Sequence, residues 1–181
     1  MKLKTALLLF MTVLTTTACT TVSTVAPIAA FEPGAKWALL PMVNQTDTPQ
    51  AGLSAEAIAE HGLRLRGLRD IARYPVALSR DSLFEPSERR VAEEAQKWAR
   101  EQGIRYALTG VVEEWRYKVG IDGEPAVGVT LQVLDLSNGQ IIWSASGAKS
   151  GWSREALSGV ARKLLYQLLD TFPMESGQSK R

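Results

Sequence analysis

The sequence predicts one α/β domain in which helices pack on a single mixed β-sheet. Residues 104–147 contain three β-prone runs joined by turn signals at 121–125 and 137–140, which indicates a meander. Apolar residues with helical spacing, beginning near Ser87 and near Ser153, predict one helix before this meander and another after it. With 181 residues and 45% hydrophobic content, the chain is long enough for one such core plus terminal tails.

The N-terminal segment has the pattern of a lipoprotein signal peptide. Two lysines precede an apolar run that is too short to span a bilayer permanently, so we expect residues 1–18 to be cleaved off. The letters TTAC end at Cys19 and resemble a bacterial lipobox, although Thr16 stands where Leu is usual. An alternative is ordinary secretion with an incidental cysteine. Acylation is favoured because it would remove a lone free thiol from an oxidising compartment and would anchor the chain to a membrane.

The net charge of the mature chain does not point to any particular partner. Removal of Lys2 and Lys4 with the signal peptide reduces Lys+Arg from 21 to 19, which equals the 19 Asp+Glu residues. A balanced chain of this kind gives no reason to expect nucleic-acid binding. The single cysteine excludes an intrachain disulfide and makes a cysteine-based zinc site a poor interpretation.

The first elements of the mature chain are a tether, a strand and a helix. Residues 19–34 are rich in Thr, Ala and Pro without periodicity, which predicts a flexible tether behind the lipidated cysteine. The apolar run 36–41 predicts a buried strand. Ser54 is expected to cap a helix that continues to Leu68. Its other face carries four basic residues, Arg64, Arg66, Arg69 and Arg73. This basic face is interpreted either as a solvated surface or as a contact with lipid headgroups or an acidic partner.

A second strand and a second helix complete the first half of the domain. Residues 75–78 predict a short strand. Ser87 is then expected to cap an amphipathic helix that stops at Gly103. The core face of this helix is expected to carry Val91, Ala95, Trp98 and Ala99.

The meander begins with an unusually long run from Ile104 to about Tyr117. Typical strands have ~5–6 residues, and this one changes from apolar to charged and aromatic along its length. We therefore expect the first hairpin to project past the sheet, with Asp122 and Glu124 at its tip.

The second hairpin has the Asn-Gly signal at residues 138–139. Both residue types tolerate positive φ, so the pair predicts a two-residue type I′ turn. Such a turn would pair Leu136 with Ile141 and Leu134 with Trp143 across the ladder.

The last helix is expected to begin at Ser153, and residues 174–181 are expected to be a disordered tail. Its core stripe is Leu157, Val160, Leu164, Leu168 and Phe172. The predicted order over residues 35–173 is therefore β-α-β-α-β-β-β-α.

The residue inventory argues against an enzyme. His61 is the only histidine and has no recognisable nucleophile arrangement around it. No glycine-rich phosphate loop follows a strand, and no cluster has metal-ligand spacing, so we expect no cofactor and no metal. The carboxylate pair Asp122/Glu124 shares one exposed turn, whereas a glycosidase holds its two carboxylates on rigid walls across a cleft.

Two tryptophans have an interpretation outside the core. Trp115, with Arg116 and Tyr117, is interpreted either as packing or as an interface, where these residue types are enriched. Trp152 lies between Lys149 and Arg154 in a strand-to-helix loop, which suits a membrane interface. The alternative is a tryptophan that staples the start of the last helix.

Several stretches resemble the PelC family, the outer-membrane lipoproteins of the Pel exopolysaccharide export system. The resemblance covers the whole domain and is carried by WALLP at 37–41, YALTG at 106–110, EWRYKVGIDGEP at 114–125, WSASG at 143–147 and GWS at 151–153. The broader pattern of a TG strand followed by DLSNGQIIWS also resembles lipoproteins related to the curli secretion lipoprotein and to the TolB amino-terminal domain. Thr20 after the cysteine is similar to lipoproteins that are exported to the outer membrane.

The resemblance implies a homo-oligomeric, dodecamer-sized ring on the periplasmic face of the outer membrane. Such a ring would carry palmitate or similar chains on Cys19 and pass a cationic polysaccharide to the β-barrel porin PelB for the biofilm matrix. Asp122 and Glu124 would face the polymer, and Trp152, Lys149 and Arg154 would meet the lipid. Subunit contacts would come from Arg105, Arg116, Trp115 and Tyr117, and the sequence does not choose between the two arginines. The alternative is a ring-forming or partner-activating lipoprotein of another envelope secretion or cell-wall system.

Overall fold

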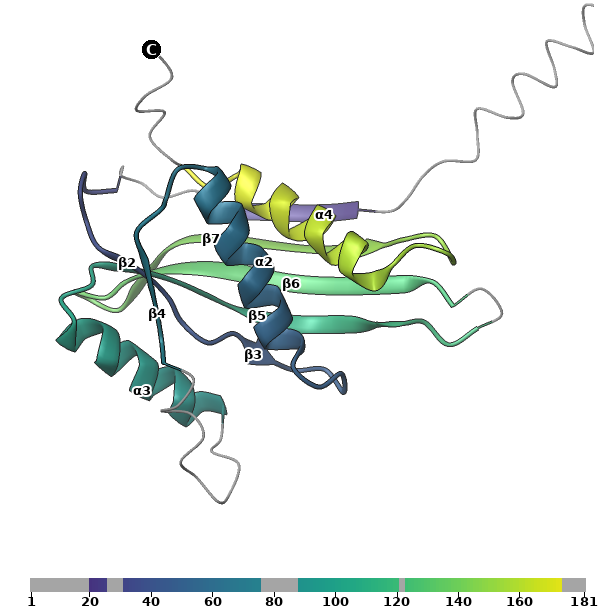
Figure 1. Cartoon of the computed structure of the whole chain (residues 1–181), viewed down its shortest axis with the longest axis horizontal. Helices are drawn as coiled ribbons and strands as arrows, with labels where there is room; N and C mark the ends of the chain where they lie inside the picture. Colours follow the sequence, from purple (N-terminus) through teal and green to yellow (C-terminus); the bar gives the residue numbers. More distant parts are fainter. Residues whose placement is uncertain (1–19, 26–30, 76–87, 121–122, 174–181) are drawn as a thin grey trace, which may run out of the picture.

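The computed structural model describes residues 20–25, 31–75, 88–120 and 123–173. They form one mixed sheet with helices packed against it (Figure 1). In chain order the elements are β1 (Thr20–Val25), β2 (Trp37–Leu39), β3 (Val43–Asn44), α2 (Ala51–Leu65), β4 (Ile71–Arg73), α3 (Glu88–Glu101), β5 (Tyr106–Tyr117), β6 (Pro125–Asp135), β7 (Gln140–Ser150) and α4 (Leu157–Asp170). The order across the sheet is β1-β7-β6-β5-β2-β4, and β3 pairs with β5.

The predicted α/β class is confirmed, and the element order holds with β1 and β3 added to it. β2 is parallel to β4 and β5, whereas β5, β6 and β7 form the expected antiparallel meander. β5 contains 12 residues. Its hairpin with β6 extends beyond α2 and α4 in Figure 1.

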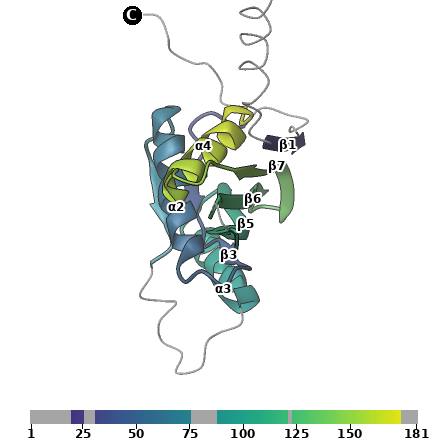
Figure 2. The same cartoon turned by 90° about the vertical axis from the view of Figure 1, so that its right-hand side faces the viewer.

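The helices lie on opposite faces of the sheet. Successive strand residues point to opposite faces, and Trp37 and Leu39 belong to the large core that includes α2 and α4. Ala38 and Leu40 belong instead to a smaller core with Ala95 and Ala99 of α3. Figure 2 shows α2 and α4 together on one side of the long strands. Polar side chains of β5, β6 and β7 also bond to one another across the sheet, since the Thr130 hydroxyl bonds to Glu113 and to Ser146.

An aromatic cluster closes the large core at the end of α4. Phe172 packs against Phe31, Trp37 and Trp143 with ring centroids 5.1, 5.6 and 5.2 Å away. The predicted core stripe of this helix is confirmed, since Val160, Leu164 and Leu168 are fully buried and Leu157 is partly buried against them.

Both predicted helix starts in the α2–α4 layer are wrong. α2 begins at Ala51 after Gln50, which has φ 60, so Ser54 lies exposed inside the helix. The early start is set by packing: Glu56 accepts a hydrogen bond of 2.9 Å from the Met42 N–H, which holds the first turns against the β2–β3 segment. α4 begins at Leu157 instead of Ser153, because the preceding residues form a turn.

The second short strand lies earlier than predicted. β4 is Ile71–Arg73, and Ala72 pairs with Ala38 of β2. Pro75 follows this strand, and the rest of the predicted strand, residues 76–78, lies outside the described residues, as does Ser87. The strand register is decided by the parallel ladder with β2, which local apolar content does not reveal. The predicted stop of α3 is confirmed, since Gly103 has φ 66.

The second hairpin turn is longer than predicted, and its register differs. Leu134 pairs with Ile141 and Val133 pairs with Trp143, with an irregularity between Val133 and Leu134. Asn138 does not have positive φ, so the turn is not type I′. Asp135 organises the turn, because its Oδ1 accepts hydrogen bonds from the Ser137 N–H (2.9 Å) and hydroxyl (2.6 Å).

The predicted flexible tether is wrong for its first part. Thr20–Val25 form β1, an edge strand that pairs with β7 from Thr20↔Lys149 to Val25↔Ser144. Open strand edges accept a further strand through their unpaired backbone groups, and β7 offers such an edge. The signal peptide, Cys19 and the predicted tail 174–181 lie outside the described residues.

Candidate functional site

The acidic hairpin tip is formed where β5 and β6 end. The Lys118 N–H donates a hydrogen bond of 2.7 Å to the Glu124 carbonyl, and Gly123 adopts φ 52 in the turn. Glu124 is half-buried, and Val119 beside it is fully exposed. Asp122, the second predicted carboxylate, lies outside the described residues.

The loop that carries Trp152 lies directly against this hairpin. The Gly151 N–H donates a hydrogen bond of 2.8 Å to the Pro125 carbonyl at the start of β6. A Cβ on Gly151 would lie 2.4 Å from Val160 Cγ2 and 3.0 Å from Pro125 Cγ, so the loop, the hairpin and α4 meet there without room for a side chain. Glu124, one of the two predicted polymer-facing residues, and Trp152, predicted to face the membrane, are therefore at the same end of the described part of the molecule.

Trp152 is 60% exposed, so its ring does not staple the start of α4. Its backbone is positioned by Glu155, whose Oε2 accepts a hydrogen bond of 3.4 Å from the Trp152 N–H and whose Oε1 forms an ion pair with Lys163. The pKa of Glu155 is lowered mainly by its hydrogen bond with Lys163 and to a smaller extent by its hydrogen bond with the Trp152 N–H. Arg154 is exposed in the same loop. Sequence reasoning did not identify Glu155 as the residue that shapes this loop.

The N-terminal strand begins beside the same loop. The Lys149 ammonium donates a hydrogen bond of 2.7 Å to the Thr20 hydroxyl, and the two residues are register partners. Lys149 is thus half-buried against the protein and is not a freely exposed cation. Cys19 immediately precedes Thr20 in the sequence, and the register partner of Thr20, Lys149, comes three residues before Trp152.

The four predicted interface residues do not form one patch. Arg105 and Arg116 lie at opposite ends of β5, separated by roughly 35 Å at the usual rise per residue. Trp115 is only 6% exposed and packs in the large core, so we correct its assignment to a subunit contact. Tyr117 is 51% exposed, and its hydroxyl accepts a hydrogen bond of 3.1 Å from the Leu157 N–H at the start of α4.

The two arginines also differ in how they are held. Arg105 pairs with Asp135 at 2.8 Å and with Glu32 at 3.5 Å, and its guanidinium lies 5.5 Å from the Tyr106 ring centroid. Burial alone would raise the pKa of Asp135, but the Ser137 and Arg105 hydrogen bonds outweigh it and lower that pKa. Arg116 pairs with Glu114 at 3.0 Å and is largely exposed.

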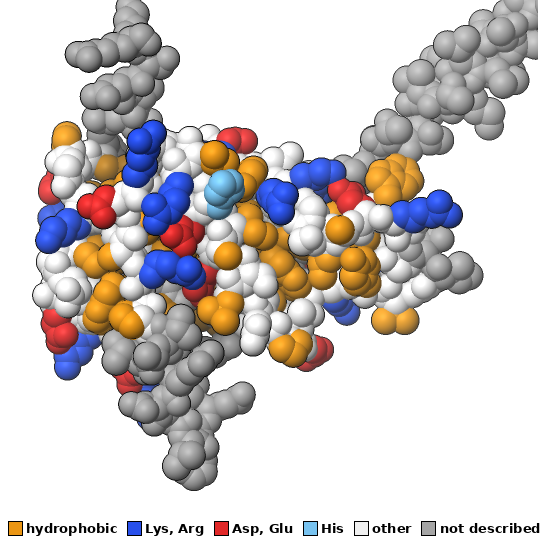
Figure 3. Space-filling view, in the orientation of Figure 1, with side chains coloured by type: hydrophobic (Ala, Val, Ile, Leu, Met, Phe, Trp, Pro, Cys, Tyr) orange, Lys and Arg blue, Asp and Glu red, His pale blue; other side chains and the backbone are white. Residues whose placement is uncertain are grey.

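The arginines predicted to share one helix face are spread over α2, the residues after it and β4, and most of them are neutralised within the subunit. In Figure 3, Lys and Arg side chains lie across the α2–α4 face with acidic side chains among them. Arg64 pairs with Glu60 at 2.8 Å, Arg73 pairs with Glu60 at 3.3 Å, and Arg66 pairs with Asp170. This pairing supports the interpretation of the basic face as a solvated surface.

An open polar hollow of about 440 Å³ lies at the base of the first hairpin, beside the buried Trp115. Its lining combines residues 45–48, which follow β3, with residues 113–116 of β5. Glu113 and Asp47 add exposed carboxylates there. No local pattern in the sequence predicts this hollow, because its two walls are distant in the chain.

The described residues contain no group of His, Cys, Asp and Glu that could hold a metal ion. Of the helices in the described part of the chain, none has the length and apolar character needed to cross a membrane.

The comparisons with known proteins point to one family. A PelC dodecamer from Paraburkholderia phytofirmans is 42% identical over 84% of this chain and 96% of its own, with a TM-score of 0.70. A point mutant of that dodecamer is 43% identical over 84% and 97%, with a TM-score of 0.71. Lipoprotein GNA1162 from Neisseria meningitidis shares the fold at 18% identity, covering 75% and 96%, with a TM-score of 0.54. No family model matches the chain, and no curated protein matches it.

Proposed function

This chain belongs to the PelC family, and on that premise we propose that it is an outer-membrane lipoprotein whose copies form a ring on the periplasmic side. The ring collects Pel exopolysaccharide and guides it to the β-barrel export porin PelB for the biofilm matrix. The observation that carries this proposal is the convergence of the N-terminal strand, the exposed Trp152 and the acidic hairpin at one end of the molecule.

The membrane contact is assigned to this end. Lipid on Cys19 would enter the bilayer next to Thr20, and Lys149 ties Thr20 to the strand that leads to Trp152. An exposed tryptophan with Arg154 beside it suits the headgroup region, where aromatic rings and cations are both favourable. The lipid anchor and the indole side chain of Trp152 together orient each subunit on the membrane.

The subunit contacts are assigned to the hairpin more than to Arg105. The structures of both relatives are dodecamers, and closed rings use two different surfaces of each subunit. Arg116 and Tyr117 are exposed at the surface, although Arg116 pairs with Glu114 and the Tyr117 hydroxyl accepts a hydrogen bond from the Leu157 N–H. Arg105 already satisfies Asp135 and Glu32 within its own chain, so a neighbour would have to compete with both.

The polymer contact is assigned to the hairpin tips and to the hollow at their base. Ring symmetry would repeat Asp122, Glu124 and Glu113 around the opening, beside the membrane where a porin receives the chain. A single exposed carboxylate attracts weakly, because salt screens charges beyond ~8 Å at physiological ionic strength. Many weak contacts suit transport, since a cationic polymer can move from one subunit to the next without being trapped.

The proposal is tested with Asp122→Asn/Glu124→Gln, which keeps side-chain shape and removes charge. The mass of the purified ring is measured first, and polymer secretion is then measured in cells that lack the wild-type chain. We expect normal rings, normal membrane fractionation and reduced secretion, with the largest defect at low ionic strength. Undiminished secretion from correctly assembled rings would contradict the polymer-facing role, and a strictly monomeric wild-type chain at high concentration would contradict the ring.

A further inference from the structure

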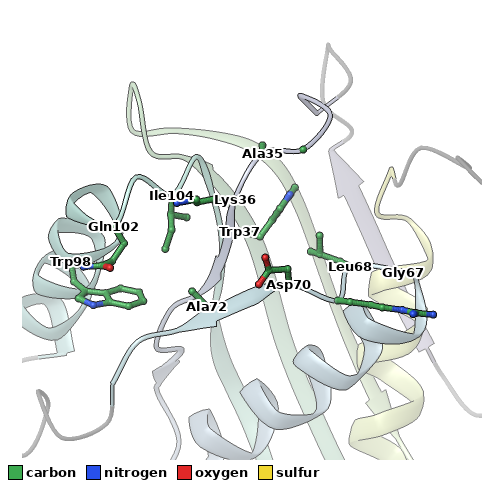
Figure 4. A pocket seen from close by; sticks show the side chains of 12 residues that line it. Ala35, Lys36, Trp37, Gly67, Leu68, Asp70, Ala72, Trp98, Gln102 and Ile104 are labelled. Carbon is green, nitrogen blue, oxygen red and sulfur yellow. The ribbon is translucent and has the colours of Figure 1, made fainter.

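A cavity of about 620 Å³, open to solvent, lies at the end of the sheet where β2 and β4 begin. Its walls come from three separate parts of the chain, seen together in Figure 4. Residues 34–37 lead into β2, residues 67–72 connect α2 to β4 and enter it, and residues 98–104 end α3. This volume is within the ~300–1,000 Å³ of sites that bind small molecules.

One wall of the cavity is a rigid aromatic surface. The half-buried Trp98 ring extends from α3 toward Ala72 (Figure 4). It also makes an edge-to-face contact with Tyr74, with ring centroids 5.6 Å apart. Leu68 and Ile104 add apolar surface to the lining. A held ring loses little conformational entropy on binding, and its flat face can pack on the C–H face of a sugar ring.

The remaining lining offers both donors and acceptors. Asp70 is an acceptor, Lys36 and Arg69 are donors, and the Gln102 amide is both. Across the described ranges, the side chains of Asp70, Lys36 and Gln102 form no hydrogen bond or ion pair, and they are exposed. Because a hydroxyl group both donates and accepts, a polyhydroxylated ligand can satisfy such a mixed set.

The charges in the lining select against a cationic ligand. Lys36 and Arg69 outnumber the single carboxylate of Asp70. The geometry points to an uncharged pyranose as the ligand, such as an N-acetylhexosamine unit of a polysaccharide, stacked on Trp98 and hydrogen-bonded to Asp70 and Gln102.

The inference rests on the proposed function for the identity of the polymer. Figure 1 places α3 and the start of β2 at one end of the sheet and the β5–β6 tip at the other. The cavity would therefore hold uncharged units of the polymer away from the membrane, while the acidic tips attract its charged units. Two chemically different contacts at the two ends of one subunit would align the polymer along the subunit.

The test is calorimetric titration of the full chain in detergent with two trisaccharides. One is the neutral β-1,4-linked trimer of N-acetylglucosamine, and the other is the same trimer without its acetyl groups, which is cationic. We expect the neutral trimer to bind more tightly at this site. Asp70→Asn should weaken it about tenfold, as expected for a lost hydrogen bond to a charged group. Ala72→Phe should abolish it by filling the cavity. Matched controls are Glu93→Gln and Ala57→Phe, which change exposed positions on α3 and α2.

Equal or tighter binding of the cationic trimer, or unchanged binding by Ala72→Phe, would overturn the inference. Binding by the monomeric chain that is lost in the ring would also overturn it, because a second copy would then cover the cavity. Ring mass and polymer secretion are measured on the same variants. If the wild-type chain assembles and supports secretion but does not bind the neutral trimer, only the inference about this site is overturned. If it binds the trimer but neither assembles into a ring nor supports secretion, only the proposed function is overturned.

Discussion

Gly151→Ala should destabilise the junction that joins the Trp152 loop, the hairpin and α4. The added Cβ would lie 2.4 Å from Val160 Cγ2 and 2.7 Å from Glu155 Oε2. Val160 is fully buried, so its methyl group cannot move aside into solvent. Gly151 does not have positive φ, so alanine brings no backbone strain and the cost comes from contact alone. Overpacking of this kind costs about 1–3 kcal/mol of unfolding free energy.

A double-mutant cycle with Val160→Ala tests this reasoning by urea denaturation. Val160→Ala alone removes buried methyl groups and should cost about 1–3 kcal/mol. The double variant should be more stable than the sum of the two losses by about 1–2 kcal/mol, because the shortened residue 160 makes room for the new methyl. Gly159→Ala is the matched control: a Cβ there meets no atom within 4 Å, and alanine in a helix should stabilise by up to about 1 kcal/mol. Wild-type stability of Gly151→Ala, or additive losses in the cycle, would refute the tight junction.

Two further predictions follow from the same structure. Trp152→Ala should reduce binding of the lipidated chain to anionic vesicles by ~10- to 100-fold. Because Trp152 is 60% exposed, the melting temperature should change by less than about 3 °C. A large loss of thermal stability would show that the indole of Trp152 supports the fold. Asp135→Asn should lower the unfolding free energy at neutral pH by about 1–3 kcal/mol. The folded pKa of Asp135 is depressed, so its contribution is present above the unfolded value near ~3.9 and is lost as pH falls through the folded value. The gap between wild type and variant should therefore close in strong acid, and a gap that is constant from neutral pH to acid would contradict the ionic role.

The sequence predicted well those elements whose signals are local. The long β5, the meander and the core stripe of α4 follow from strand propensity and helical spacing, and the structure has all three. The start of α2 was predicted wrongly because Ser54 is a good cap only in isolation, whereas the contact of Glu56 with the Met42 N–H decides where the helix begins. The register of the second hairpin depends on the Asp135 side chain, which competes with the Asn-Gly signal for control of the turn.

The candidate site was predictable only residue by residue. The exposure of Trp152 follows from its place in a polar loop, and the structure confirms it. Its proximity to the acidic hairpin depends on the Gly151–Pro125 hydrogen bond, which joins segments from different strands. Trp115 was ambiguous because alternation along β5 changes at the irregularity between Val112 and Glu114, which turns Trp115 toward the core. The cavity beside Trp98 collects side chains from three distant segments, and no local pattern in the sequence reveals it.

The pairing of β1 with β7 changes how a lipid on Cys19 would hold the domain. A free segment of residues 19–34 could reach roughly 55 Å at full extension and would let the domain tumble above the bilayer. Because Thr20 is fixed to Lys149, only one residue would separate the strand from a lipid on Cys19, and the distance from the domain to the membrane would be a few ångströms. A pull along the chain axis loads the whole β1–β7 ladder in shear, and its hydrogen bonds share the force instead of opening one at a time. A lipid anchor at this position would act as a short rigid mount, and a subunit mounted this way would resist tilting if the polymer proposed above pulled on its hairpin.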